Sequence, residues 1–352
     1  MPILEGEQAD KMKMRFHATS GCLAIFLMLA SVSGWSQKEP ASAPKIEIDE
    51  AARLVNLTPQ SSVQYDYVVT AAIRLLLFWM SRDDVGQGYI RLGTAPGQSP
   101  LETIQLVMGS DPAKAPLGVN RWGAAAEVWR RTDSSGAFFG FMKASKGESV
   151  SAARKELSRE KEAQRYQFEG IISRTSNGQE TSITVPISSA KDFTLHQLPL
   201  AQQMVMEQLK TTTRVPRALD ARSLPGCATG SGFLFTLREL MAAALSGQKT
   251  PMTRCYIYFA RRYTMTIDRC EPVKQMKVAL KLRGATRKVE KIYRNLRKAD
   301  FRIVNAQTGL PTDFQMVFGE SGELKGVPVQ VEFQPNWWFR VTINLKPDTP
   351  GH

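Results

Sequence analysis

Residues 337–346 read WWFRVTINLK and predict how the chain ends. Every second residue of this stretch is large and apolar, and most residues between them are polar. Because side chains alternate between the two faces of a β-strand, this pattern is typical of a half-buried strand. We therefore predict a final antiparallel strand with Trp337 and Phe339 in the core and Trp338 on the opposite face.

The same alternation extends outward from this strand over the C-terminal third of the chain. It recurs at residues 263–267 and 327–333. Residues 289–296 also fit a helix, but because their neighbours are strands we predict a strand. Residues 233–245 carry an apolar stripe at helical spacing, with Ser231 as the expected N-cap. We expect one helix followed by an antiparallel meander that forms a sandwich or a partly closed barrel.

The N-terminal half is also predicted to be built of antiparallel strands. Residues 65–79 alternate with one apolar face, and the polar residues 81–86 predict a turn after them. Residues 88–92 would then return as the partner strand. Hairpins are expected at 124–131 with 137–142 and at 166–174 with 181–187, and helices at 151–165 and 198–210.

The predicted fold class is thus α+β and rich in β-structure, in two parts. Residues 210–232 contain prolines and glycines and show neither period, so we predict a linker there. The expected layout is an N-terminal α+β domain over residues 50–212, a linker at 213–232 and a C-terminal domain of one helix and β-strands over 233–348.

The first residues of the chain predict export. Lys11, Lys13 and Arg15 precede an apolar run over residues 22–30, which small residues follow. This is the layout of a cleavable signal peptide, here residues 1–36, with translation starting at Met1 or at Met12 or Met14. The run is too short for a spanning helix, which needs about 20 residues, so no transmembrane segment is expected after cleavage. Residues 37–49 are expected to form a flexible lead. The predicted location is the periplasm or the extracellular space.

The charge of the chain predicts an anionic partner. The formal net charge is +13, with a pI near 9.6. Export makes nucleic acid an unsuitable partner and leaves anionic envelope lipid or polysaccharide. Basic residues concentrate at 277–302, where an anion-binding face competes with a solvated sheet edge as the explanation. The anion-binding candidates are Arg287, Lys288, Lys291 and Arg294.

Few residues suggest catalysis. His196 is the one histidine between the signal peptide and the final residue, which disfavours zinc sites and histidine triads, and we predict neither a metal nor a cofactor. Asp83 and Asp84 are candidates for acid and base chemistry, although adjacent residues of a strand face opposite ways. Cys227, in a glycine-rich loop, is a candidate nucleophile with His196 as its base.

Three cysteines follow the signal peptide, namely Cys227, Cys255 and Cys270. If Ile257 lies on the core face, Cys255 points inward and Cys270 lies on the opposite face with Thr264. Bringing Cys255 and Cys270 together would require a shift of register. Any disulfide is therefore expected to involve Cys227.

Several strings resemble a family of exported bacterial proteins with no assigned activity. They are RLLLFW at 74–79 with RDDVG at 82–86, DPAKAP at 111–116 with NRWG at 120–123, and the segment 327–339 ending in QPNWWF. The resemblance implies export and the two-part layout, and it implies no catalytic residue.

Two functional hypotheses follow. The first is a non-catalytic envelope or secreted binding protein for an anionic or lipid-like ligand. The alternative is a hydrolase acting on an envelope or extracellular polymer through Asp83, Asp84 or Cys227. The sequence does not assign an oligomeric state.

Overall fold

The computed structural model describes fifteen segments of the chain: residues 45–56, 60–75, 78–95, 101–111, 113–115, 122–132, 134–143, 166–176, 179–189, 198–211, 217–220, 232–258, 261–282, 284–336 and 339–347. Several predictions fall outside these residues: the signal peptide, the helix at 151–165, His196, Cys227, Trp337 and Trp338.

One antiparallel sheet accounts for most of the described chain. Its 14 strands within the described residues follow the order β8-β7-β6-β5-β4-β3-β2-β1-β14-β13-β12-β11-β10-β9. The strands are β1 (Ser61–Leu75), β2 (Phe78–Ala95), β3 (Leu101–Ser110), β4 (Trp122–Arg130), β5 (Ser135–Lys143), β6 (Tyr166–Ser176), β7 (Gln179–Ser189), β8 (Arg217–Asp220), β9 (Met252–Tyr258), β10 (Arg261–Leu280), β11 (Val289–Asn305), β12 (Pro311–Gly319), β13 (Pro328–Asn336) and β14 (Phe339–Leu345).

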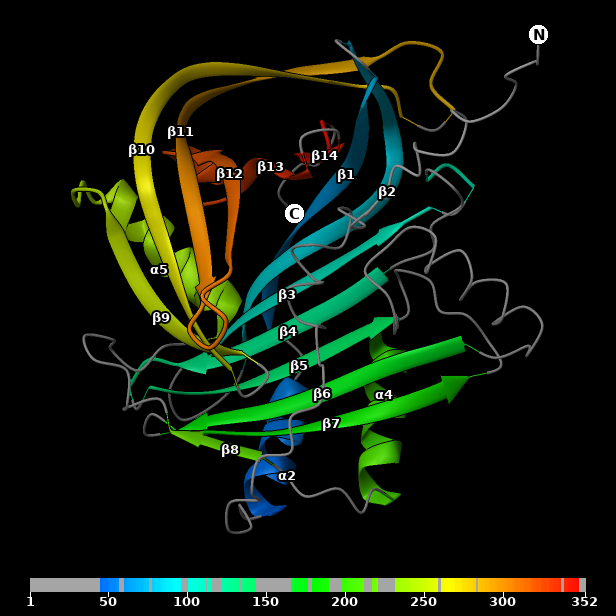
Figure 1. Ribbon diagram of the computed structural model, residues 1–352, viewed down its shortest axis with the longest axis vertical. Coiled ribbons are helices and arrows are strands. Elements are labelled where there is room, and N and C mark those ends of the chain that lie inside the picture. Colours follow the sequence, from blue (N-terminus) through cyan, green and yellow to red (C-terminus); the bar gives the residue numbers. More distant parts are fainter. Residues whose placement is uncertain are drawn as a thin grey trace, which may run out of the picture.

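The sheet curls until it nearly closes into a barrel (Figure 1). The rings of Phe138 on β5 and Tyr258 on β9 lie 4.6 Å apart, so the strand at one end of the sheet order contacts the fourth strand from the other end. The first strand pairs with the last, with Tyr67 opposite Leu345. Strands from both predicted domains therefore share one sheet. A barrel or a sandwich was expected from the C-terminal strands alone, and the nearly closed barrel that is observed includes the N-terminal strands as well.

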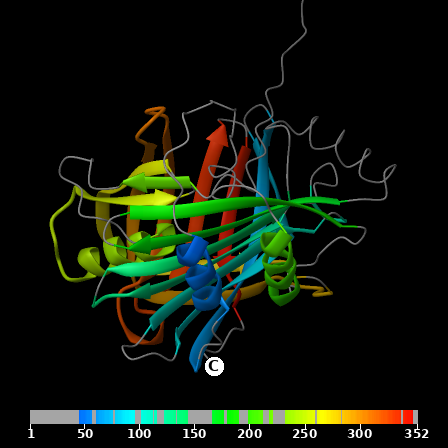
Figure 2. The ribbon, with the colours of Figure 1, turned by 90° about the horizontal axis from the view of Figure 1, so that it is seen from below.

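Helices cover both faces of the sheet. α5 (Phe233–Leu245) packs inside, where its Phe235 and Leu240 belong to the larger hydrophobic core. α2 (Lys45–Val55) and α4 (Leu198–Thr211) lie on the outer face of β4–β7 and close a second core around Phe139 and Val205 (Figure 2). The short 3-10 helix η4 (Gly322–Leu324) connects β12 and β13. Strands β4 and β5 are thus buried on both faces, which explains their nearly continuous apolar sequence.

The predicted strand at 65–79 is wrong in its end point. β1 stops at Leu75 and β2 begins at Phe78, so the residues expected to form a turn at 81–86 lie within β2. A register shift between Val69 and Ala71 and a positive φ of 54° at Asp84 accommodate these polar residues inside the strand. A β-bulge tolerates turn-forming residues without ending the strand, which is why composition misplaced the turn.

Other elements lie close to their predicted positions. α5 spans the predicted helix, and residues 289–296 belong to a strand, as expected. In β14, Phe339, Val341 and Leu345 are buried. Ordered structure begins earlier than expected, since α2 starts at Lys45, within the predicted flexible lead. Within the described residues, no helix is long and apolar enough to cross a membrane.

Candidate ligand pocket

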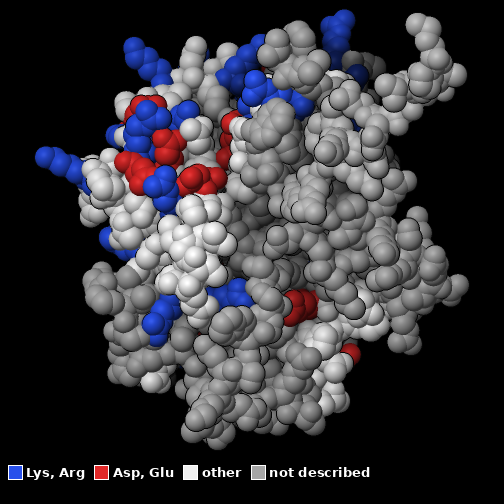
Figure 3. Space-filling view, in the orientation of Figure 1, with Lys and Arg blue, Asp and Glu red and all other residues white. Residues whose placement is uncertain are grey.

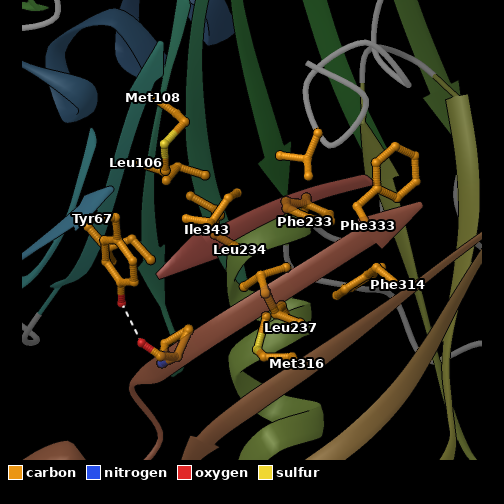
Figure 4. Close-up of a pocket in the computed structure, with 14 residues that line it drawn as sticks. Tyr67, Leu106, Met108, Phe233, Leu234, Leu237, Phe314, Met316, Phe333 and Ile343 are labelled. Atoms are coloured by element: carbon orange, nitrogen blue, oxygen red, sulfur yellow. Dashed lines mark hydrogen bonds between the residues drawn. The ribbon is translucent and has the colours of Figure 1, made fainter. Parts of the chain in front are cut away.

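An apolar cavity lies inside the barrel, between α5 and two groups of strands (Figure 4). Its volume is about 80 Å³. Three walls surround it: β1–β3 form the first, β12–β14 the second and α5 the third. The lining residues are Tyr67, Ile90, Leu106, Met108, Phe233, Leu234, Leu237, Phe314, Met316, Pro328, Val331, Phe333, Val341 and Ile343.

The strand periodicity explains why these residues share one face. Residues directly opposite each other on neighbouring strands point to the same side of a sheet. Met316, Val331 and Ile343 form one such row across β12, β13 and β14. Phe314, Phe333 and Val341 form the next row, two residues further along each strand. Alternation therefore directs two complete apolar rows into the cavity.

Tyr67 is the lining residue with a polar side-chain group. Its hydroxyl donates a hydrogen bond to the carbonyl oxygen of Pro328 at 2.8 Å. Burial raises the pKa of Tyr67 well above 10, so the phenol stays neutral and keeps this bond. The described walls thus offer dispersion contacts to a ligand, and their chemistry suits hydrocarbon.

The position of α5 depends on a buried carboxylate beside this cavity. Glu127 of β4 accepts hydrogen bonds from the backbone N–H groups of Leu234 at 2.9 Å and Phe235 at 3.0 Å. Burial raises the pKa of Glu127 to about 7, against the lowering effect of these bonds. Gly232 permits this approach, because a Cβ there would lie 2.6 Å from the carboxylate carbon.

The expected N-cap of this helix is therefore corrected. Gly232, rather than Ser231, occupies the N-cap position, and it makes no side-chain capping bond. Glu127 satisfies the first N–H groups of α5 from a strand more than 100 residues earlier. Sequence reasoning searches for caps among adjacent residues, so it missed this one.

Asp83 and Asp84 do not form a pair of converging carboxylates. Asp83 accepts bonds from the Thr70 hydroxyl at 3.1 Å and from the backbone N–H of Lys281 at 3.1 Å. Asp84 is buried and forms an ion pair with Lys114. Each carboxylate thus makes its own contacts with different parts of the barrel.

Cys255 and Cys270 lie on the opposite faces of the sheet from those predicted. The expectation that they are not bridged to each other is nevertheless confirmed. Tyr256 and Tyr258 face the inner core, and Cys255 lies opposite Thr264, on the other face. A bulge between Ile267 and Arg269 turns Cys270 towards the inner core. Cys255 is disulfide-bonded and Cys270 is a free thiol, so the two are not bridged to each other.

The structure describes only some of the remaining candidate residues. His196 and Cys227 lie outside the described residues. Among the residues that are described, no group of three or more His, Cys, Asp or Glu side chains could hold a metal ion. Arg287, Lys288 and Arg294 are exposed, and Lys291 is half-buried with its ammonium 5.3 Å from the centroid of the Tyr293 ring.

Comparisons with known proteins complete the description. No protein-family model matches the chain, and the search of curated proteins found no match. Among solved structures, the chain is similar to a beta-barrel-like protein of Domain of Unknown Function DUF1849 from Brucella abortus. The two share 11% sequence identity over 82% of this chain and 98% of that chain, with a TM-score of 0.38.

Proposed function

We propose that this protein is a non-catalytic binding protein that holds an apolar, lipid-like ligand in the barrel cavity. The supporting observation is the lining of the cavity, which consists of thirteen apolar residues and Tyr67. The Tyr67 hydroxyl is already hydrogen-bonded to the carbonyl oxygen of Pro328. An apolar pocket whose tyrosine hydroxyl is already hydrogen-bonded favours hydrocarbon over polar ligands. The export predicted from residues 1–36 would place this activity in the bacterial envelope or outside the cell.

The size of the cavity supports a short hydrocarbon group as the part that binds. A volume of about 80 Å³ suits a few methylene groups rather than a whole lipid. Each methylene removed from water contributes about 0.8 kcal/mol, so four of them contribute about 3 kcal/mol. Binding should accordingly strengthen with chain length until the cavity is filled.

A pair of matched substitutions tests this proposal. Ile343→Phe adds volume inside the cavity, whereas Ile292→Phe makes the same exchange at a residue that is 53% exposed on β11. We expect the wild type to bind a fluorescent fatty-acid analogue saturably and to release it when decanoate is added. Ile343→Phe should weaken this binding at least tenfold, and Ile292→Phe should leave it unchanged.

The controls separate loss of binding from loss of folding. Both variants should unfold cooperatively with midpoints near that of the wild type, because extra volume next to a cavity is accommodated. Equal binding of the probe by both variants, or failure of decanoate to compete, would contradict the proposal. The contacts of Asp83 and Asp84 are structural, so they give the hydrolase alternative no specific support.

A further inference from the structure

The ends of β10 and β11 form a two-stranded ribbon that arches over the barrel (Figure 1). β9 pairs with β10 only over residues 261–267, and β12 pairs with β11 only over 296–304. In the described structure, residues 274–280 and 289–294 thus pair with each other alone. We call residues 274–294 the basic ribbon.

Hydrogen bonds from described residues at both ends of the basic ribbon attach it to the rest of the barrel. The Tyr293 hydroxyl donates to the carbonyl oxygen of Leu345 at 3.4 Å. At the far end, the backbone N–H of Lys281 donates to Asp83 of β2 at 3.1 Å. The ribbon is therefore held over the barrel with one face inward, where Val278 and Leu280 are buried, and the other face outward.

Charge is segregated along this hairpin. In the half that lies within the sheet, three basic residues have acidic partners. Arg269 pairs with Asp300 at 3.0 Å, and Arg302 pairs with Asp313 at 2.9 Å. Arg297 pairs with Glu320 at 2.7 Å. Figure 3 shows basic and acidic side chains interleaved on the upper left of the molecule. These ion pairs neutralise part of the positive charge of this half of the hairpin.

The basic ribbon has the opposite character. It carries eight Lys and Arg residues against a single acidic residue, Glu290, which pairs with Lys277 at 2.7 Å. Lys274, Lys281, Arg287, Lys288 and Arg294 are exposed, and within the described residues no ion pair involves them. Lys and Arg side chains gather along the upper edge of the molecule in Figure 3. A concentrated positive charge of this kind attracts an anionic surface.

Exposed apolar side chains accompany this charge. Ile292 is 53% exposed on the basic ribbon, opposite Lys277 in the strand register. Met80 is 62% exposed on β2, three residues before the Asp83 that binds Lys281. Basic residues around apolar side chains are typical of surfaces that bind the interface of a lipid bilayer.

We propose that the basic ribbon docks the protein onto an anionic lipid bilayer. The exposed Lys and Arg side chains bind lipid headgroup phosphates, and Ile292 enters the interface between headgroups and acyl chains. This inference is independent of the cavity, because the ribbon residues that carry it do not line the cavity. Docking would hold an apolar site close to a source of hydrocarbon ligands.

The test compares two variants that lose the same charge. The ribbon variant changes Arg287, Lys288, Lys291 and Arg294 to Ser. The control variant changes four exposed basic residues outside the ribbon to Ser, namely Arg53, Lys210, Lys249 and Lys325. Full-length mature protein is sedimented with vesicles of phosphatidylcholine alone or with 30% phosphatidylglycerol at about 0.1 M salt.

We expect the wild type to bind the anionic vesicles and not the neutral ones. Each basic residue at an anionic surface contributes roughly fivefold to affinity, so the ribbon variant should bind at least a hundredfold more weakly. The affinity of the control variant for the anionic vesicles should fall tenfold or less. If the ribbon variant and the wild type bind alike, the ribbon is a solvated edge that only prevents strand pairing, and the proposal is wrong.

A second variant distinguishes a bilayer from an acidic polysaccharide. Ile292→Ser should weaken vesicle binding severalfold, including at 0.5 M salt, where the charges are screened. The same variant should bind dextran sulfate as the wild type does. If Ile292→Ser has no effect on vesicles, the ribbon binds polyanions in general and the bilayer proposal is overturned. Ile343→Phe lies in the cavity and should retain vesicle binding. Failure of the cavity proposal can therefore be distinguished from failure of the membrane-docking proposal.

Discussion

Glu127 of β4 and Leu234 of α5 are joined by a hydrogen bond of 2.9 Å, from the backbone N–H of Leu234 to Oε1 of Glu127. The two residues are 107 positions apart, and the contact is buried. The bond fixes the first turn of α5 to the inner face of the sheet, and Leu234 also lines the cavity. The ionisation of one carboxyl group is thus linked to the helix that forms a wall of the candidate ligand site.

The raised pKa of Glu127 predicts how stability depends on pH. Its pKa rises from 4.5 to about 7 on folding, so between these values the folded state binds more protons than the unfolded state. The free energy of unfolding should therefore fall as pH rises through this window, by about 3 kcal/mol. Glu127→Gln should remove this contribution, since the amide resembles the protonated acid and does not ionise.

Urea unfolding at pH 5 and pH 8 measures this effect. Between pH 5 and pH 8 the free energy of unfolding of the wild type should fall by about 2.5 kcal/mol through this group, and that of Glu127→Gln should lack this fall. Glu290→Gln makes the same exchange at an exposed residue and should follow the wild type. Identical pH dependence in wild type and Glu127→Gln would show that Glu127 does not titrate in this range.

Asp84→Asn tests the ion pair between Asp84 and Lys114, which lies in the segment of β2 where a turn was predicted. Asparagine tolerates the positive φ of 54°, so the substitution removes the charge and keeps the backbone. Lys114 then loses its ion-pair partner at position 84, whose side chain is 2% exposed. We expect the free energy of unfolding, measured in urea, to fall by roughly 1–3 kcal/mol. Binding of the fatty-acid probe should stay unchanged. A loss of probe binding without a loss of stability would instead give Asp84 a functional role.

Phe301→Ala tests the register of β11. Phe301 is 1% exposed and stacks on Phe314 with ring centroids 4.9 Å apart. Its truncation should cost about 3–5 kcal/mol, the range for large aromatic core residues. Ile292→Ala, on the same strand but exposed, should change the free energy of unfolding by about 0.5 kcal/mol or less. Equal costs in thermal or urea unfolding would mean that the strand faces are reversed.

Peptide mapping tests the cysteine assignment. We predict that Cys227 is the partner of Cys255, which is disulfide-bonded, while Cys270 is a free thiol. Burial raises the pKa of the Cys270 thiol, so alkylation at pH 7 should be slow in the folded protein and rapid in urea. A mass spectrum under non-reducing conditions should contain a peptide linking Cys227 to Cys255. A peptide linking Cys255 to Cys270 would refute the assignment.

Local pattern located most strands and failed where a bulge changed it. The alternation in residues 327–333 predicted the buried Val329, Val331 and Phe333 correctly, because successive side chains of a strand point to opposite faces. The parity argument for Cys270 failed because a bulge between Ile267 and Arg269 exchanges the faces. A bulge depends on the partner strand, which residues adjacent in sequence do not reveal.

The sequence by itself determined the β-rich class, the helix at α5 and the concentration of basic residues at 277–302, since periodicity and composition express these locally. Tertiary structure alone decided that β1 pairs with β14, which joins both ends of the chain into one sheet. It also brought Glu127 to the N-terminus of α5 and assembled a cavity from β1–β3, α5 and β12–β14. The β1–β14 pairing and the Glu127–α5 contact join residues 107 or more positions apart, and contacts at such separations are selected by packing and closure of the whole sheet.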